Sequence, residues 1–127
     1  MKTVSDLVYE QGIDYFVKMT KKYGPDWSAL FLCDTTERRR MLMNKLFEAL
    51  ENAGVPATVD VPRTLVHTVT YGAMARFRKA YRGMAEALPG LIFTQIVGID
   101  LADEQDIGRI LAALRGNIST AKDLSCV

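Results

Sequence analysis

The sequence has few of the residues that build covalent staples and metal centres. It contains two cysteines, Cys33 inside an apolar run and Cys126 near the C-terminal end, and one histidine, His67. These three side chains cannot complete the four ligands of a structural zinc site. Because a disulfide between two cysteines so placed is not expected, the composition indicates a reducing, cytoplasmic compartment. We interpret His67 as an ordinary strand residue.

Several recognition segments are also missing. No apolar stretch reaches the roughly 18 residues of a membrane-spanning helix, and no signal-peptide hydrophobic region follows Met1. No glycine-rich loop is followed by lysine and a hydroxyl residue, so the sequence has no P-loop. No serine lies on a recognisable nucleophile turn. The first two absences favour a cytoplasmic protein without membrane contact. The absence of a P-loop and of a nucleophile turn favours a protein that is not an enzyme.

The remaining composition is that of a folded domain. Apolar residues make up 49% of the chain, charged residues 24%, and the net charge is +1. A chain with this much apolar side chain and so little net charge buries a core. We expect residues 1–118 to form one α/β domain and residues 119–127 to form a flexible C-terminal tail.

Alternating segments predict the elements of this domain. Apolar residues at three- and four-residue spacing predict a helix from Ser5 to about Lys22 and another from Asp34 to about Asn52. In the second helix we expect Asp34 as the N-cap and Glu37 as its reciprocal partner. Unbroken apolar runs are typical of strands that are covered on both faces. Such runs predict strands at residues 27–33 and 91–99, and alternation of apolar and polar residues predicts strands at 57–61 and 64–71.

Residues 74–88 allow two interpretations. Met74, Phe77 and Tyr81 recur at helical spacing, which predicts a helix with a basic outer face. Alternatively, Gly72 turns a hairpin and residues 73–80 return as a strand. A last helix, capped by Asp103, ends at Gly116. The order α-β-α-β-α-β-α predicts a mainly parallel sheet of about three to five strands that is flanked by helices.

Acidic residues follow two of the predicted buried strands. Asp34 comes after the first of them and Asp100 after the last, with Asp103 close behind. Ligands of open parallel sheets bind beyond the carboxyl ends of the strands, and carboxylates there could hold Mg²⁺. The alternative is that Asp34 and Asp103 only cap helices. Mg²⁺ is therefore the one candidate cofactor.

Basic residues are concentrated in the middle of the chain. Residues 35–90 carry nine lysines and arginines against five acids, a net charge of +4. Such an excess suits an anionic partner such as DNA or RNA. The alternatives are ion pairs with Asp34, Glu37 or Asp100, and a solvated helix face. The candidate anion-binding residues are Arg38, Arg39, Arg76, Arg78, Lys79 and Arg82.

Short motifs between residues 27 and 106 are similar to those of a known family. They are Asp34-Thr35-Thr36 after an apolar strand, Tyr71-Gly72-Ala73, Arg82-Gly83, and Ile96 to Asp100 followed by Ala102-Asp103-Glu104. This layout resembles part of the ATPase core of viral DNA-packaging terminases and helicase-like motors, in which the last segment looks like a Walker B strand. The resemblance implies a strand within residues 74–88. Because no Walker A motif precedes the first strand, it also implies a motor fragment unable to hydrolyse ATP by itself.

These observations predict a small cytoplasmic binding protein without catalytic residues, derived from a phage or mobile element. It would contact nucleic acid or a protein partner through its basic middle region. One alternative is a metal-dependent phosphate-ester hydrolase that uses Asp34, Asp100 and Asp103. Another is a homo-oligomeric assembly protein, in which the methionines and the apolar first helix form the interface.

Overall fold

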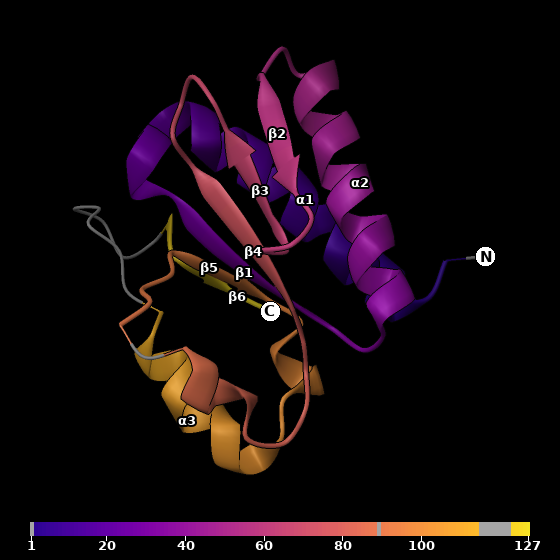
Figure 1. Cartoon of the computed structure of the whole chain (residues 1–127), viewed down its shortest axis with the longest axis vertical. Coiled ribbons are helices and arrows are strands. Elements are labelled where there is room, and N and C mark those ends of the chain that lie inside the picture. The colour runs from indigo at the N-terminus through magenta and orange to yellow at the C-terminus, as the bar shows by residue number, and fades with distance from the viewer. Residues whose placement is uncertain (1, 89, 115–122) are drawn as a thin grey trace.

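The computed structural model describes residues 2–88, 90–114 and 123–127. It is a single α/β domain around a six-stranded sheet with the order β2-β3-β4-β1-β5-β6 (Figure 1). Strand β1 pairs in parallel with β4 and β5, β6 pairs in parallel with β5, and β3 runs antiparallel to β2 and β4. The α/β class and the mostly parallel sheet are confirmed, whereas the sheet also contains antiparallel pairs and has six strands rather than about three to five. The strands are β1 (Ser28–Cys33), β2 (Ala57–Asp60), β3 (Leu65–Thr68), β4 (Met74–Lys79), β5 (Gln95–Val97) and β6 (Ser125–Cys126).

Two helical layers lie on opposite faces of this sheet. Helices α1 (Val4–Tyr23) and α2 (Thr36–Asn52) cover one face. Helix α3 (Glu104–Ala112) and the short 3-10 helix η2 (Met84–Ala87) pack on the other face, over β1 and β5. Two further 3-10 turns complete the described elements. They are η1 (Gly24–Asp26) and η3 (Ile99–Leu101).

Side-chain caps set the starts of the helices. The hydroxyl of Thr35, not the carboxylate of Asp34, caps α2, because it accepts a hydrogen bond from the N–H of Arg38 at 3.0 Å. The prediction of an Asp34–Glu37 capping box was therefore wrong: α2 starts one residue later, and a Thr side chain takes the role. Asp103 caps α3, as predicted, by accepting from the N–H of Gln105.

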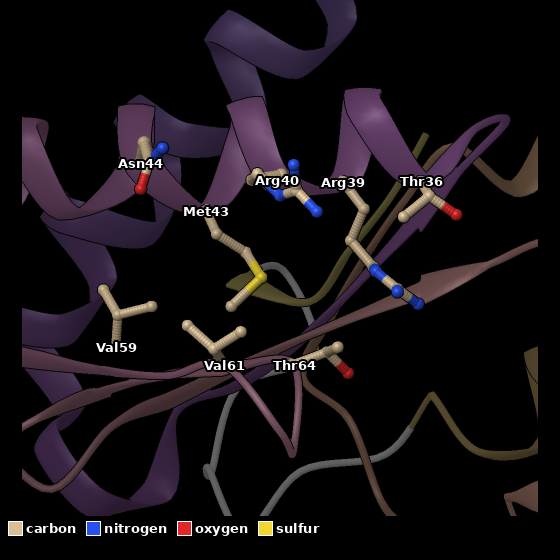
Figure 2. Close-up of a pocket in the computed structure, with 8 residues that line it drawn as sticks. All are labelled: Thr36, Arg39, Arg40, Met43, Asn44, Val59, Val61 and Thr64. Carbon is tan, nitrogen blue, oxygen red and sulfur yellow. The ribbon is translucent and has the colours of Figure 1, made fainter.

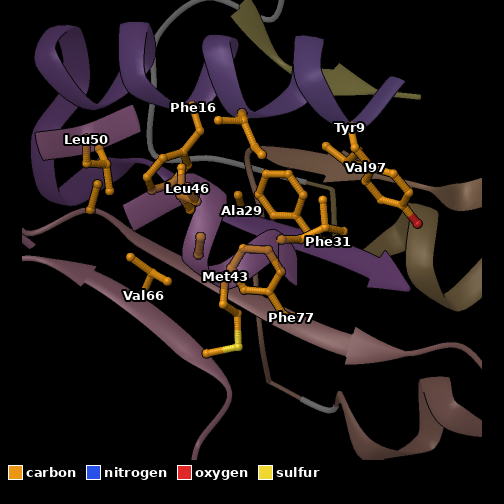
Figure 3. Close-up of a cluster of buried hydrophobic side chains, with 14 of the residues drawn as sticks. Tyr9, Phe16, Ala29, Phe31, Met43, Leu46, Leu50, Val66, Phe77 and Val97 are labelled. Atoms are coloured by element: carbon orange, nitrogen blue, oxygen red, sulfur yellow. The ribbon is translucent and has the colours of Figure 1, made fainter. Parts of the chain in front are cut away.

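The larger core lies between the sheet and helices α1 and α2 (Figure 3). Phe31 of β1 and Phe77 of β4 are opposite each other in the parallel register. Their rings stack with centroids 4.7 Å apart, and both side chains are fully buried. Phe16 of α1 and Leu46 of α2 close this layer from the helical side. The apolar segments of β1 and β5 lie next to each other in one sheet, so their carboxyl ends meet at the same edge, as predicted.

Residues 74–88 are not the helix that their spacing predicts. Residues 74–79 form strand β4, which returns from β3 through a turn at Gly72, and a 3-10 helix follows at Met84–Ala87. The alternative hairpin interpretation is thus the one that the structure confirms. The physical reason is that the backbone of β1 needs a hydrogen-bonding partner on this side. Strand β4 supplies it along six residue pairs. Tertiary pairing outweighs the local helical periodicity.

The C-terminal segment differs from the expected flexible tail where it is described. Strand β6 pairs with β5 through Ser125 and Cys126. The Nζ of Lys22 forms an ion pair with the carboxylate of Asp123 at 2.9 Å, and the hydroxyl of Tyr15 donates to the Asp123 carbonyl. These contacts anchor the segment to α1, because they satisfy its polar groups against a folded helix. Residues 119–122, which belong to the same prediction, lie outside the described residues.

Gly98 follows β5 at a point where the chain passes close to β1. Its φ is +86°, and a Cβ there would lie 2.6 Å from the carbonyl oxygen of Leu32. We therefore expect Gly98→Ala to destabilise the fold by about 1–2 kcal/mol more than Gly54→Ala. Gly54 is the matched control, since its φ is +76° but no atom lies within 4 Å of an added Cβ. Urea unfolding of both variants measures the difference, and equal losses of stability would contradict the close approach.

Candidate anion-binding site

Strand β4 places two arginines on the face of the sheet opposite α2. Side chains alternate along a strand, so buried Ala75 and Phe77 point into the core below α2, and half-buried Arg76 and Arg78 point the other way. The helical layer on that face lies over β1 and β5 and includes no residue of β2, β3 or β4 in its core. Among the described residues, this part of the sheet therefore presents a partly exposed basic face.

Arg78 contacts the turn between β2 and β3. Its Nη1 donates to the hydroxyl of Thr64 at 2.5 Å and to the carbonyl oxygen of Arg63 at 3.2 Å. Loss of hydration lowers the pKa of Arg78, and the neighbouring charges of Arg76 and Arg39 lower it further. The guanidinium of Arg39 on α2 is thus within electrostatic range of Arg78. We call Arg39, Arg76 and Arg78 the basic strip.

The basic strip lacks carboxylate partners within the part of the chain that the structure describes. Ion pairs there engage Lys2, Lys22, Arg38 and Arg63, and none engages a member of the strip. The charge of Arg78 is repelled by those of Arg76 and Arg39, so an anion that contacts these groups lowers the electrostatic free energy of the site. The arrangement suits phosphate groups, which arginine binds with parallel N–H donors.

A hollow of about 80 Å³ adjoins the strip between α2 and the edge of the sheet (Figure 2). The lining residues that come from α2 are three or four positions apart, so their side chains lie on one stripe of the helix. Met43 and Val61 form an apolar floor, with Arg39 and Thr64 toward one end and Asn44 at the other. The lining residues are Thr36, Arg39, Arg40, Met43, Asn44, Val59, Val61 and Thr64.

Thr64 holds an unusual backbone conformation at this point. Its φ is +51°, the only positive value at a non-glycine residue among those described. A β-branched residue in this region is strained. Its hydroxyl donates to the Arg63 carbonyl at 2.7 Å and accepts from Arg78. The strained turn therefore presents an oxygen that orients the Arg78 guanidinium, and such outliers concentrate at binding sites.

The other predicted basic residues do not join the strip. Arg38 turns toward α1 and forms ion pairs with Asp6 at 3.0 Å and Asp34 at 3.5 Å, so the ion-pair alternative holds for this arginine. Lys79 is exposed at the end of β4. Arg82 reaches toward α3, where its Nη2 lies 3.4 Å from the amide oxygen of Gln105. Arg38 and Arg39 diverge, although they are adjacent in sequence, because successive residues of a helix point in different directions.

The acidic residues do not form the predicted metal centre. Among the described residues, no group of three or more His, Cys, Asp or Glu side chains is placed to hold a metal ion, so Asp34, Asp100 and Asp103 do not converge. The buried side chain of Tyr9 lies at this end of β1 instead: it is 3% exposed, and its hydroxyl donates to the Leu32 carbonyl at 2.5 Å. Burial raises the pKa of the Tyr9 phenol, with smaller contributions from Cys33, Asp34 and Asp100.

The cysteines and the histidine lack features of a nucleophilic centre. Cys33 is fully buried at the end of β1, and burial raises its thiol pKa to about 12. At neutral pH the thiol therefore stays protonated and unreactive. His67 lies half-buried in β3, between Thr58 and Met74 in the register. This placement agrees with its interpretation as a strand residue.

Sequence reasoning missed the hollow and, apart from Arg39, all the residues that line it, including Arg40 and Thr64. The signal for the helical wall was present, because residues 36, 39, 40, 43 and 44 share one stripe of a helix. The opposite wall comes from the turn after β2, and its position depends on the pairing of β2 with β3. No local pattern in the sequence marks Thr64 for a positive φ, which glycine or asparagine would ordinarily supply.

Comparison of the chain with protein-family models, curated proteins and solved structures found no match. The resemblance to the ATPase core of terminases and helicase-like motors therefore stays a prediction. Within the described residues, no helix combines the length and apolarity that crossing a membrane would require.

Proposed function

We propose that this protein is a non-catalytic nucleic-acid-binding protein that contacts the phosphate backbone through the basic strip. The observation that carries the proposal is the gathering of Arg39, Arg76 and Arg78, without carboxylate partners among the described residues, from two separate elements. A strip of guanidinium groups, two on a partly open sheet face and one at the start of α2, matches the repeated negative charge of a nucleic-acid strand. A cytoplasmic location and a phage or mobile-element origin stay predictions from the sequence.

The placement of the charge supports a polymer better than a single small anion. Arg76 and Arg78 project from one face of β4, whereas Arg39 comes from the helix on the other face and lies within electrostatic range of Arg78. Residues two apart on a strand are separated by roughly 6–7 Å, close to the spacing of phosphates along an extended strand. Consecutive phosphates can then contact consecutive arginines.

The salt dependence of binding tests this proposal. If three arginines neutralise three phosphates of a single strand, we expect a log–log slope of about −2, and affinity should fall roughly 20-fold between about 50 and 200 mM salt. Fluorescence anisotropy with labelled DNA and RNA strands measures both quantities. Affinity that does not respond to salt, or the absence of binding at the lowest salt, would remove the proposal.

The alternative functions have less support from the geometry. The hydrolase interpretation needs convergent carboxylates, and the described residues provide no such group. For the assembly interpretation, Met19, Met43 and Met84 are buried in the two cores and are not available to an interface. Self-association through other residues stays a prediction.

A further inference from the structure

The hollow beside the basic strip has an apolar floor in a basic setting. Val61 is 70% exposed, although its neighbours in the hollow include the guanidinium groups of Arg39 and Arg40. The buried thioether of Met43 reaches from α2 toward Val61 (Figure 2). A bare phosphate would gain nothing from these apolar groups. The lining fits a ligand that joins an apolar face to a negative charge.

A nucleotide has this combination of properties. The faces of its base are apolar and stack on guanidinium planes, its edge carries hydrogen-bond donors and acceptors, and its phosphate is anionic. Asn44 offers both a donor and an acceptor at one end of the hollow, and Arg39 lies toward the other. The volume of about 80 Å³ is small, which suits one partly inserted ring rather than a stack.

We infer that the hollow binds one unpaired base of a single-stranded nucleic acid, while the adjoining phosphates lie on the basic strip. This inference rests on the proposed function and narrows it to single strands. In a duplex the bases are paired and stacked, so none can enter a hollow between α2 and β2 without being unpaired first. The basic strip supplies contacts with the backbone, and the hollow supplies the preference for strands whose bases are free.

Three probes of equal length separate the contribution of bases from that of phosphates. They are a labelled thymidine strand of about 12 nucleotides, an abasic strand with the same backbone charge, and a duplex. We expect the full chain to bind the thymidine strand at least about 10-fold more tightly than the abasic strand. A uridine strand of the same length shows whether RNA serves equally well.

One substitution ties this preference to the hollow. Val61→Asn removes the exposed apolar floor without adding charge, and we expect it to lower the ratio of thymidine-strand to abasic-strand affinity by about five-fold, with abasic binding unchanged. The control is Val69→Asn, at an exposed valine (57%) that follows β3 and does not line the hollow. Circular dichroism checks that both variants fold.

Each outcome bears on a different claim. Equal affinity for thymidine, abasic and duplex probes overturns the base-binding inference, while the proposed backbone contact stands. A base preference that Val61→Asn leaves intact places the base elsewhere and overturns the assignment to the hollow. No binding to any probe overturns the proposed function and the inference with it.

Discussion

Replacing Arg39 and Arg78 together with glutamine lowers the affinity for a single-stranded oligonucleotide by about 100-fold at low salt. The estimate follows from two charge-assisted hydrogen bonds to phosphate, each worth about 1.5 kcal/mol or a factor of about 10. The slope of log affinity against log salt should flatten by about 1.4, because two fewer counterions are released. Anisotropy titrations over a range of salt concentrations measure both effects.

The matched control removes the same net charge from another place. Arg82→Gln with Arg109→Gln changes two arginines that lie beside and on α3, away from the basic strip. We expect an affinity change of less than about three-fold, since distant exposed charges are screened by salt. If this control loses as much affinity as the Arg39–Arg78 variant, binding responds to net charge, and the basic strip is not the site.

Phe77→Ala has the largest expected effect on stability. Phe77 is fully buried in β4 and stacks on Phe31 of β1, so the substitution leaves a cavity in the centre of the larger core. We expect it to lower the free energy of unfolding by about 3–5 kcal/mol, a large part of the total for a domain of this size. Thermal and urea unfolding give the value directly.

Phe47→Ala is the comparison for this loss. Phe47 lies on α2 but is only half-buried, so its removal should cost clearly less. The same pair tests the central place of Phe77 in the larger core, which follows from the insertion of β4 between β3 and β1. A cost for Phe77→Ala no larger than that for Phe47→Ala would contradict this topology.

The sequence predicted the elements whose patterns are local. The run of apolar residues in β1 predicts a strand and the position of Asp103 before an apolar-periodic segment predicts a cap, and both are confirmed. The segment at β4 has two interpretations, because Met74, Phe77 and Tyr81 fit helical spacing while Ala75 and Phe77 fit strand alternation. Whether the segment forms a strand or a helix depends on its pairing with β1. Strand β1 is about 45 residues away in the chain.

The candidate site shows the same division between local and long-range information. The charge excess identified Arg39, Arg76 and Arg78 as candidates, but it could not separate them from Arg38. Arg38 forms an ion pair with Asp6 of α1 and is therefore not part of the basic strip. Asp6 comes near Arg38 only through the packing of α1 against α2. Likewise, the Tyr9 hydroxyl lies against Leu32 at the end of β1 and close to Gly98 after β5, although nothing in the sequence around Tyr9 predicts this position.

An NMR titration with a thymidine strand tests the central claim most directly, by following the Nε–Hε signals of the arginines. Arg39, Arg76 and Arg78 should shift together with one dissociation constant, because they contact one strand. The signals of Arg82 and Arg109 should stay in place. Shifts largest at Arg82 and Arg109, or equal at every arginine, would contradict a binding surface built from the basic strip.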